Sequence, residues 1–288
     1  ARRPLGRPPG ALRRAAAGPA ALFPGHSLRR PDLAGGDRAD RASGHEHPLG
    51  RALARRRVSR PMTGLATRPH SGPHTRMITR MRGNDSGSVF LEVAPGCIAT
   101  VETSLEMTAP RASPLQPPAQ AADYAVERRE RMDLAEFRGL YDLIGAEWLW
   151  FSRNRLSDEA LAAILHDPAV EVWVLSDERG PAGLLELDAR TPDAVEIAFF
   201  GVAARLEGTG AAARLMALAL ERAWARPGVR RLWLHTCTLD HPKALAFYRR
   251  AGFRAYARAI EVSPDPRLDG SLPTTVADHH PIIPPETP

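Results

Sequence analysis

The stretch IAFFGVAARLEGTGAAARLMALAL, residues 197–220, passes from an apolar run through two glycines into a segment rich in alanine and leucine. The apolar run is typical of a buried strand, and the last part repeats its apolar residues at helical spacing. The residues on that helical face are Ala212, Leu215, Met216, Ala219, Leu220 and Ala223. A strand, a tight turn and an amphipathic helix in direct succession favour a layered arrangement of helices on a sheet.

The turn between them contains Gly208 and Gly210 and is either a plain connection or an anion site. Backbone N–H groups at a helix start carry partial positive charge, and Arg205 would add a full one. A P-loop would need GK[ST] at the end of the turn, which is missing here. Gly208, Gly210 and Ala213 fit the dinucleotide pattern G-x-G-x-x-A, but too few strand–helix units follow for a doubly wound domain.

The segments around this turn predict an alternation of strands and helices. We expect strands at 97–107, within 170–188 (two strands), at 194–203, at 230–237 and at 254–262. We expect helices over 132–151, from Ser157 to Pro168, after the glycine turn, and over 242–252, with a loop at 111–122. This order indicates an α/β chain of the α+β type, with a mixed sheet flanked by helices.

Charge divides the chain into two parts. Residues 1–82 hold 18 arginines and four acidic residues, whereas the remainder holds 21 basic and 29 acidic residues. Residues 1–90 are rich in Arg, Pro and Gly without a durable period, so we expect a disordered extension. Such an arm is dispensable, binds nucleic acid through its arginines, or targets an organelle. No aromatic residue interrupts RALARRRVSR to stack on bases, so nucleic acid is the less favoured partner.

Two cysteines, Cys97 and Cys237, exclude a disulfide framework and a cysteine-based metal cluster. This usage suits a reducing compartment, and we expect a cytoplasmic protein. No apolar run reaches the length of about 18 residues that spans a bilayer, so no membrane partner is expected. Residues 264–288 form a proline-rich tail without a period.

Arg205-Leu206-Glu207-Gly208-Thr209-Gly210 resembles the R/Q-x-x-G-x-G/A turn of the GNAT superfamily of N-acetyltransferases. Further along, LWLHTC and HPKALAFYRRAGF are similar to the fifth strand and fourth helix of that family. The ending A-x-x-x-Y-x-x-x-G-F is carried by Ala244, Tyr248, Gly252 and Phe253. The resemblance covers roughly residues 95–263. It implies a mixed, mostly antiparallel sheet and a pyrophosphate cradle for acetyl-coenzyme A that ends at Ala211.

The resemblance also implies roles for individual residues. Tyr248 would protonate the leaving thiolate, and the backbone N–H of Val202 would stabilise the oxyanion, with a bulge at Gly201. His241 stands where many relatives carry Asn, so it would contact the coenzyme, cap the following helix or, less favoured, act as a base. Between the splayed neighbouring strands the family holds the pantetheine arm.

Glu196 is the candidate base, because a carboxylate within the apolar segment AVEIAFFGV has a raised pKa if it is buried. Glu186 is a second candidate. His235 is expected in the core and Cys237 to act as small packing. Trp148, Trp150 and Phe151 either line the acceptor pocket or pack between helix and sheet.

Together these features predict an enzyme that moves an acetyl group from acetyl-coenzyme A directly to an amine. The acceptor, a small molecule or a protein amine, and the oligomeric state stay open, and no metal is expected. The alternatives are a catalytically silent acyl-coenzyme A binding module and a nucleic-acid-binding protein that acts through its basic arm.

Overall fold

The computed structural model describes residues 77–285 of the chain. The expectation of disorder for residues 1–76, and with it the arginine-rich arm, lies outside the described residues. A hairpin begins directly after that boundary, where we expected disorder to continue to residue 90. Its strands are β1 (Ile78–Gly83) and β2 (Val89–Val93), paired antiparallel. Asn84 closes the turn, because its side-chain oxygen accepts hydrogen bonds from the N–H groups of Ser86 and Ser88.

A seven-stranded sheet forms the centre of the described region. Its strands are β3 (Cys97–Met107), β4 (Ala125–Arg129), β5 (Val170–Asp177), β6 (Gly180–Asp188), β7 (Ala194–Val202), β8 (Arg231–Cys237) and β9 (Arg254–Pro264). They lie in the order β4-β5-β6-β7-β8-β3-β9, and every neighbouring pair is antiparallel except β7 with β8. The expected mixed, mostly antiparallel α/β sheet is therefore confirmed. The short edge strand β4 was not predicted.

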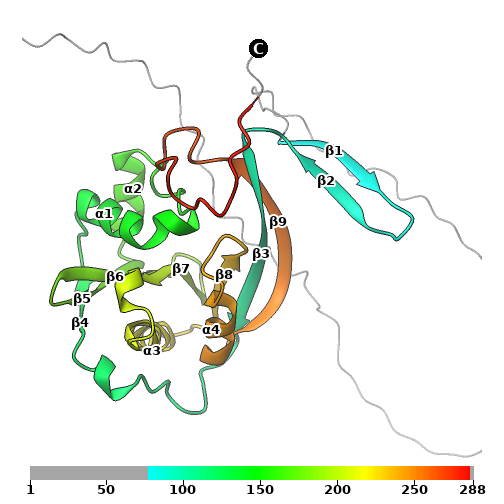
Figure 1. Ribbon diagram of the computed structural model, residues 1–288. Coiled ribbons are helices and arrows are strands. Elements are labelled where there is room, and N and C mark those ends of the chain that lie inside the picture. Colours follow the sequence, from blue (N-terminus) through cyan, green and yellow to red (C-terminus); the bar gives the residue numbers. More distant parts are fainter. Residues whose placement is uncertain (1–76, 286–288) are drawn as a thin grey trace, which may run out of the picture. The chain divides into compact units, whose positions relative to one another are not determined.

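Helices cover both faces of this sheet (Figure 1). On one face α1 (Leu134–Gly145) and α2 (Asp158–Leu165) bury an apolar stripe against β5, β6 and β7. On the other, α3 (Ala211–Trp224) and α4 (Ala244–Ala251) pack on β3, β6, β7 and β8. Side-chain caps start the first pair: Asp133 accepts hydrogen bonds at the start of α1, and Ser157 accepts one at the start of α2.

α1 ends earlier than we predicted, because the chain reverses after Gly145. Leu149 adopts a left-handed conformation with φ 54°, and the Trp150 N–H donates to the Gly145 carbonyl over 3.0 Å. The indole of Trp150 thereby lies directly against Gly145, in the place where a Cβ atom would be. The aromatic run after α1 is thus folded back onto the helix rather than continuing it.

The proline-rich tail after β9 is ordered by an internal ion pair. Arg267 and Asp265 are 1% and 4% exposed, and their side chains meet at 2.8 Å. The same guanidinium donates to the carbonyls of Ala277 and His280. Leu272 and Ala277 pack with Leu149 and Leu239, so the tail rests on the loops that follow α1 and β8.

The contact between Gly145 and Trp150 generates a prediction with an internal control. Gly145→Ala would force a methyl group into the indole, so the free energy of unfolding should fall by about 1–3 kcal/mol. Gly139→Ala, in the same helix with no atom within 4 Å of the added Cβ, should raise it by about 0.5–1 kcal/mol. Urea unfolding of the full chain measures both, and equal effects would contradict the packing described.

Candidate active site

The strands β7 and β8 pair over only three residues and then part. Ala194, Val195 and Glu196 pair with Arg231, Leu232 and Trp233. Beyond this point β7 continues to Val202 against β6 alone, while β8 continues to Cys237 against β3 alone. Beyond this point β7 and β8 therefore form no hydrogen bonds with each other at the centre of the sheet. The backbone groups on their facing edges are open to a ligand.

The N–H of Val202 points toward this gap. Ala203 donates to the carbonyl of Ala182 over 2.7 Å, which makes them a hydrogen-bonded pair. Hydrogen-bonded and non-hydrogen-bonded pairs alternate along antiparallel strands, so Val202, which faces Gly183, directs its backbone groups to the opposite edge. The bulge expected at Gly201 lies earlier, opposite Glu186–Leu187. Glycine at 201 instead serves close packing, because a Cβ there would meet Ile144 at 2.5 Å.

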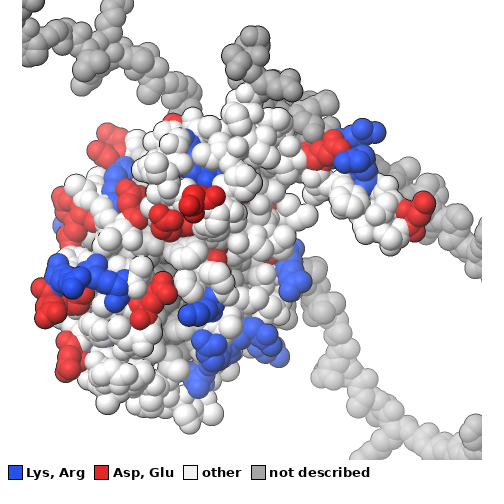
Figure 2. Space-filling view, in the orientation of Figure 1, with Lys and Arg blue, Asp and Glu red and all other residues white. Residues whose placement is uncertain are grey.

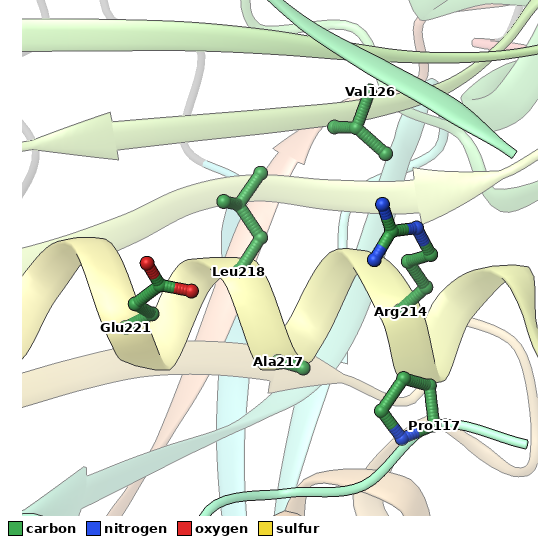
Figure 3. Close-up of a pocket in the computed structure, with 6 residues that line it drawn as sticks. All are labelled: Pro117, Val126, Arg214, Ala217, Leu218 and Glu221. Carbon is green, nitrogen blue, oxygen red and sulfur yellow. The ribbon is translucent and has the colours of Figure 1, made fainter. Parts of the chain in front are cut away.

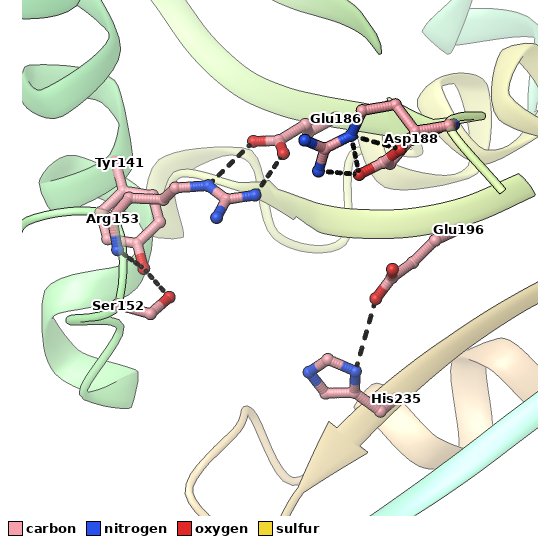
Figure 4. Close-up of polar contacts among 8 residues, drawn as sticks. Tyr141, Ser152, Arg153, Glu186, Asp188, Glu196 and His235 are labelled. Carbon is pink, nitrogen blue, oxygen red and sulfur yellow. Dashed lines mark hydrogen bonds and ion pairs between the residues drawn. The ribbon is translucent and has the colours of Figure 1, made fainter. Parts of the chain in front are cut away.

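Glu196 occupies the last paired position before the gap. Burial raises the pKa of its carboxyl from 4.5 to about 7, against the opposing influence of His235. The Glu196 Oε1 lies 3.8 Å from the Nδ1 of His235 (Figure 4), and the Glu196 side chain keeps 23% exposure. A half-buried carboxyl that gains and loses a proton near neutral pH has the properties of a general base.

A buried ion pair that sequence reasoning missed supports this region. Arg153 binds Glu186 through two contacts, of 2.5 and 3.4 Å, and Glu186 is fully buried (Figure 4). The second candidate base is thus occupied by a guanidinium. Arg153 also lies over the Phe199 ring at 4.9 Å. Arg153 and Glu186 are 33 positions apart in the sequence and meet only in the folded structure. The spacing of residues in the sequence therefore could not predict this ion pair.

Tyr248 lies on the opposite face of the sheet from Glu196. Its ring centroid lies 6.0 Å from that of Phe200, in the part of β7 that no longer pairs with β8, and 6.3 Å from that of Phe253. Burial raises the pKa of the phenol, and the negative charge of Asp240 adds to that shift. No described residue hydrogen-bonds its hydroxyl. The phenol therefore keeps its proton and has it available for a ligand beside β7.

The loop from β8 to α4 is tied to both sides of the gap. Asp240 accepts hydrogen bonds from the Thr236 hydroxyl, the Cys237 N–H and, over 3.3 Å, the indole of Trp150. His241 accepts the Lys243 N–H at Nδ1 just before α4, and its Nε2 lies 3.3 Å from Glu207. The link between His241 and Glu207 connects this loop to the glycine turn.

The glycine turn presents backbone N–H groups at the start of α3. Gly208 and Gly210 have φ values of 75° and 91°, which favour glycine. Thr209 binds the Leu206 carbonyl and accepts the Ala211 N–H, while Leu206 is buried in the core. Within the described residues the N–H groups of Gly208 and Gly210 have no acceptor, and those of Ala212 and Ala213 lie in the first helical turn.

Arg205 does not add a free charge to the turn as we expected. Its guanidinium donates to Asp177 over 2.9 and 3.1 Å and so binds the turn between β5 and β6. Glu207 is the other charged group of the turn, and it faces His241. The attraction for an anion therefore comes from the backbone amides and the helix start rather than from a side-chain cation.

The remaining predicted residues take varied places. His235 is 46% exposed and lines the gap, so its assignment to the core was wrong. Burial raises the pKa of the Cys237 thiol, in keeping with a packing role. Trp150 is partly buried and packs with Tyr141 and Phe199 between α1 and the sheet, while Trp148 contacts His241 and His279. Phe151 lies under the guanidinium of Arg155.

No other feature of the described region forms an alternative site that includes the predicted functional residues. A hollow of about 180 Å³ beside α3, between Pro117, Val126 and Leu218, holds none of these residues (Figure 3). Among residues 77–285 no group of three His, Cys, Asp or Glu side chains could hold a metal ion. None of the helices described there is long and apolar enough to cross a membrane.

The raised pKa of Glu196 predicts how stability depends on pH. The unfolded chain ionises this carboxyl near pH 4.5 and the folded protein near pH 7, so the carboxyl destabilises the fold increasingly between these values. Glu196→Gln should therefore be more stable than the wild type by roughly 1–3 kcal/mol at pH 8, with the difference vanishing below pH 4.5.

Urea unfolding at several pH values measures this difference. Glu159→Gln, on an exposed position of α2, corrects for the loss of one negative charge. A difference that is constant with pH would show that Glu196 does not carry a raised pKa.

Part of the chain is similar to proteins of a known family and to solved structures. Residues 137–253 match the model of the acetyltransferase (GNAT) family. No curated protein matches the chain. Among solved structures, a functionally unknown conserved protein from Staphylococcus epidermidis is 16% identical, and a GCN5-related N-acetyltransferase from Sphaerobacter thermophilus is 19% identical, each with a TM-score of 0.39. Both similarities cover 59% of this chain, and 64% and 52% of those proteins, less than two thirds of each.

An acetyltransferase of the GNAT family from Streptococcus pneumoniae is 20% identical, over 46% of this chain and 87% of its own, with a TM-score of 0.35. The family match spans α1 through Phe253, and so includes the gap between β7 and β8, the glycine turn and α4. Residues 137–253 are thus similar to the acetyltransferase domain of the GNAT family.

Proposed function

We propose that the chain is an N-acetyltransferase that moves an acetyl group from acetyl-coenzyme A to a primary amine by direct transfer. The family match supports acyl transfer in general. The observation that carries the finer proposal is Glu196, a carboxyl with a pKa of about 7 at the point where β7 and β8 part. An alkylammonium must lose a proton before it attacks, and this base is suited to take it.

The coenzyme would bind along the open edge and the glycine turn. Arg205–Ala211 would form the cradle, in which the N–H groups of Gly208 and Gly210 hold the pyrophosphate together with those of the first turn of α3. The pantetheine arm would lie in the gap, where Val202 offers its N–H to the thioester oxygen. His241 borders the same turn through Glu207, which favours it as a contact of the coenzyme.

The two faces of the sheet divide the chemistry between them. Glu196 lies on the α1 face and takes a proton from the ammonium, directly or through water, so the amine attacks the thioester from that face. The Val202 N–H stabilises the oxyanion that forms. As the intermediate collapses the C–S bond breaks, and Tyr248, on the α4 face, protonates the thiolate and regains its proton from solvent. The products are the acetamide and the free coenzyme thiol.

The acceptor would approach over the α1 face, past His235 and the loop that carries Trp148. The chemistry requires only a primary amine on the acceptor, so the acceptor is either a small molecule or a protein. The two free cysteines, Cys97 and Cys237, favour a reducing compartment such as the cytoplasm.

Binding of the coenzyme should raise the stability of the full chain. A ligand that binds only the folded state at a hundred times its Kd stabilises by about 2.7 kcal/mol. We expect millimolar acetyl-coenzyme A to raise Tm by several degrees and NAD to leave it unchanged. Gly210→Ala, which strains a φ of 91° and brings a Cβ within 3.1 Å of Ala121, should lose the shift. A cooperative transition without a shift would refute the cradle.

Tyr248→Phe separates an enzyme from a binding module. Removing the hydroxyl should lower kcat by about 10²-fold or more while the Kd for acetyl-coenzyme A changes less than threefold. Tyr256→Phe is the matched control on β9, where the ring contacts Arg231, and should retain full turnover. The assay measures thiol release with a panel of amines. Tight coenzyme binding by the wild type without turnover on any amine would favour the silent module.

A further inference from the structure

A groove lined by residues of α4, β3 and β9 contains none of the residues that this chemistry uses. It is about 500 Å³ in volume and runs between the end of α4 and the start of β9. Its lining combines an apolar floor with arginines at the rim. The lining residues are Thr103, Leu245, Arg249, Gly252, Phe253, Arg254, Ala255 and Arg258. Basic side chains gather over this region in Figure 2.

Within the part of the chain that the structure describes, the arginines of the groove have no acidic partner. Arg249, Arg254 and Arg258 are exposed, and among the described residues no carboxylate forms an ion pair with them. Many other arginines of the domain, such as Arg155, Arg205 and Arg226, do bind carboxylates. An unbalanced cluster of positive charge repels itself, so it favours an anionic partner.

The end of α4 adds to this charge imbalance. The last carbonyls of a helix carry partial negative charge, which would ordinarily offset nearby arginines. Here Arg111 donates to the carbonyls of Arg250 and Ala251 over 3.3 and 3.0 Å and cancels that charge. Among residues 77–285, therefore, no acidic group pairs with the positive charge of the groove.

The strand that borders the groove has an open edge. β9 is the last strand of the sheet and pairs only with β3, from Arg254 to Pro264, with a shift of register at Tyr256. No described backbone group pairs with residues 255–263 on the outer edge. A long, unpaired edge is a template for a further strand.

We propose that this groove and the open edge of β9 bind an extended acidic segment of a partner protein as an added strand. The edge supplies main-chain hydrogen bonds that only a polypeptide matches. Arg254 pairs with Glu106 and Arg258 with Thr103 on β3, so the shift of register sets the two arginines about 10 Å apart along the strand direction. Both line the groove, where they suit two carboxylates of the segment. Leu245, Phe253 and Ala255 accommodate an aliphatic side chain between those carboxylates.

Two other occupants fit less well. A symmetric contact centred on the groove would bring the arginines of one copy against those of a second, and like charges repel. Single-stranded nucleic acid binds with bases stacked on exposed aromatic rings, whereas the aromatic side chain of the groove, Phe253, is 2% exposed.

The test measures binding of a fluorescein-labelled heptapeptide, in which Glu alternates with Ala and Leu, to the full chain. The matched probe carries Gln in place of every Glu, and an oligothymidylate tests nucleic acid. The groove variant is Arg254→Ser with Arg258→Ser. The control variant, Arg131→Ser with Arg179→Ser, removes the same charge from exposed positions elsewhere, so any binding by residues 1–82 is equal in both.

We expect the acidic peptide to bind, the Gln peptide to bind at least tenfold more weakly, and the groove variant to lose at least tenfold in affinity while the control variant does not. Bound peptide should also slow hydrogen exchange of the amides in residues 255–263. Equal affinities of the two variants, or a preference for the oligothymidylate that depends on Arg254 and Arg258, would overturn the proposal. So would a dimer in which these amides are already protected without peptide.

Discussion

The parting of β7 and β8 after Glu196 is the constraint on which the rest of the site depends. Aromatic packing on the two faces of β7 holds in place the stretch that no longer pairs with β8. Phe199 packs against Trp150 and Tyr141, while Phe200 stacks on Phe247. Asp240 then joins the end of β8 to Trp150 across the gap. Backbone groups at the centre of a sheet are left unpaired only at a cost, so a gap braced in this way is suited to a ligand that pairs with them.

Most charged side chains of the site are paired with a group of opposite charge. Arg205 is balanced by Asp177, Glu186 by Arg153, and Glu207 faces His241. Glu196 stands apart because a histidine at 3.8 Å is its nearest partner, so desolvation decides its pKa. A neutral acid at the gap becomes a base near pH 7, where an ion-paired carboxylate would stay ionised.

Local sequence patterns predicted those elements whose structure is determined by residues close in sequence. The alternation in residues 97–107 gave both ends of β3, and the two glycines with positive φ gave the turn before α3. Glu196 was found because a carboxylate in an apolar strand is conspicuous. The partners of Arg205 and Glu186 depend on the register of distant strands, and β4 is too short to show a period. The early end of α1 depends on how Trp150 folds back against Gly145.

The position of β3 has a consequence for how much chain the domain needs. β3 lies between β8 and β9, although 123 residues separate its end from the start of β8. A fragment restricted to residues 137–253 would lack β3, β4 and β9, and β8 would become an exposed edge with its apolar face half uncovered. During synthesis β3 must also wait for partners made more than a hundred residues later, which favours slow completion of the sheet. We therefore expect a unit that folds by itself to begin before Cys97 and to extend through β9.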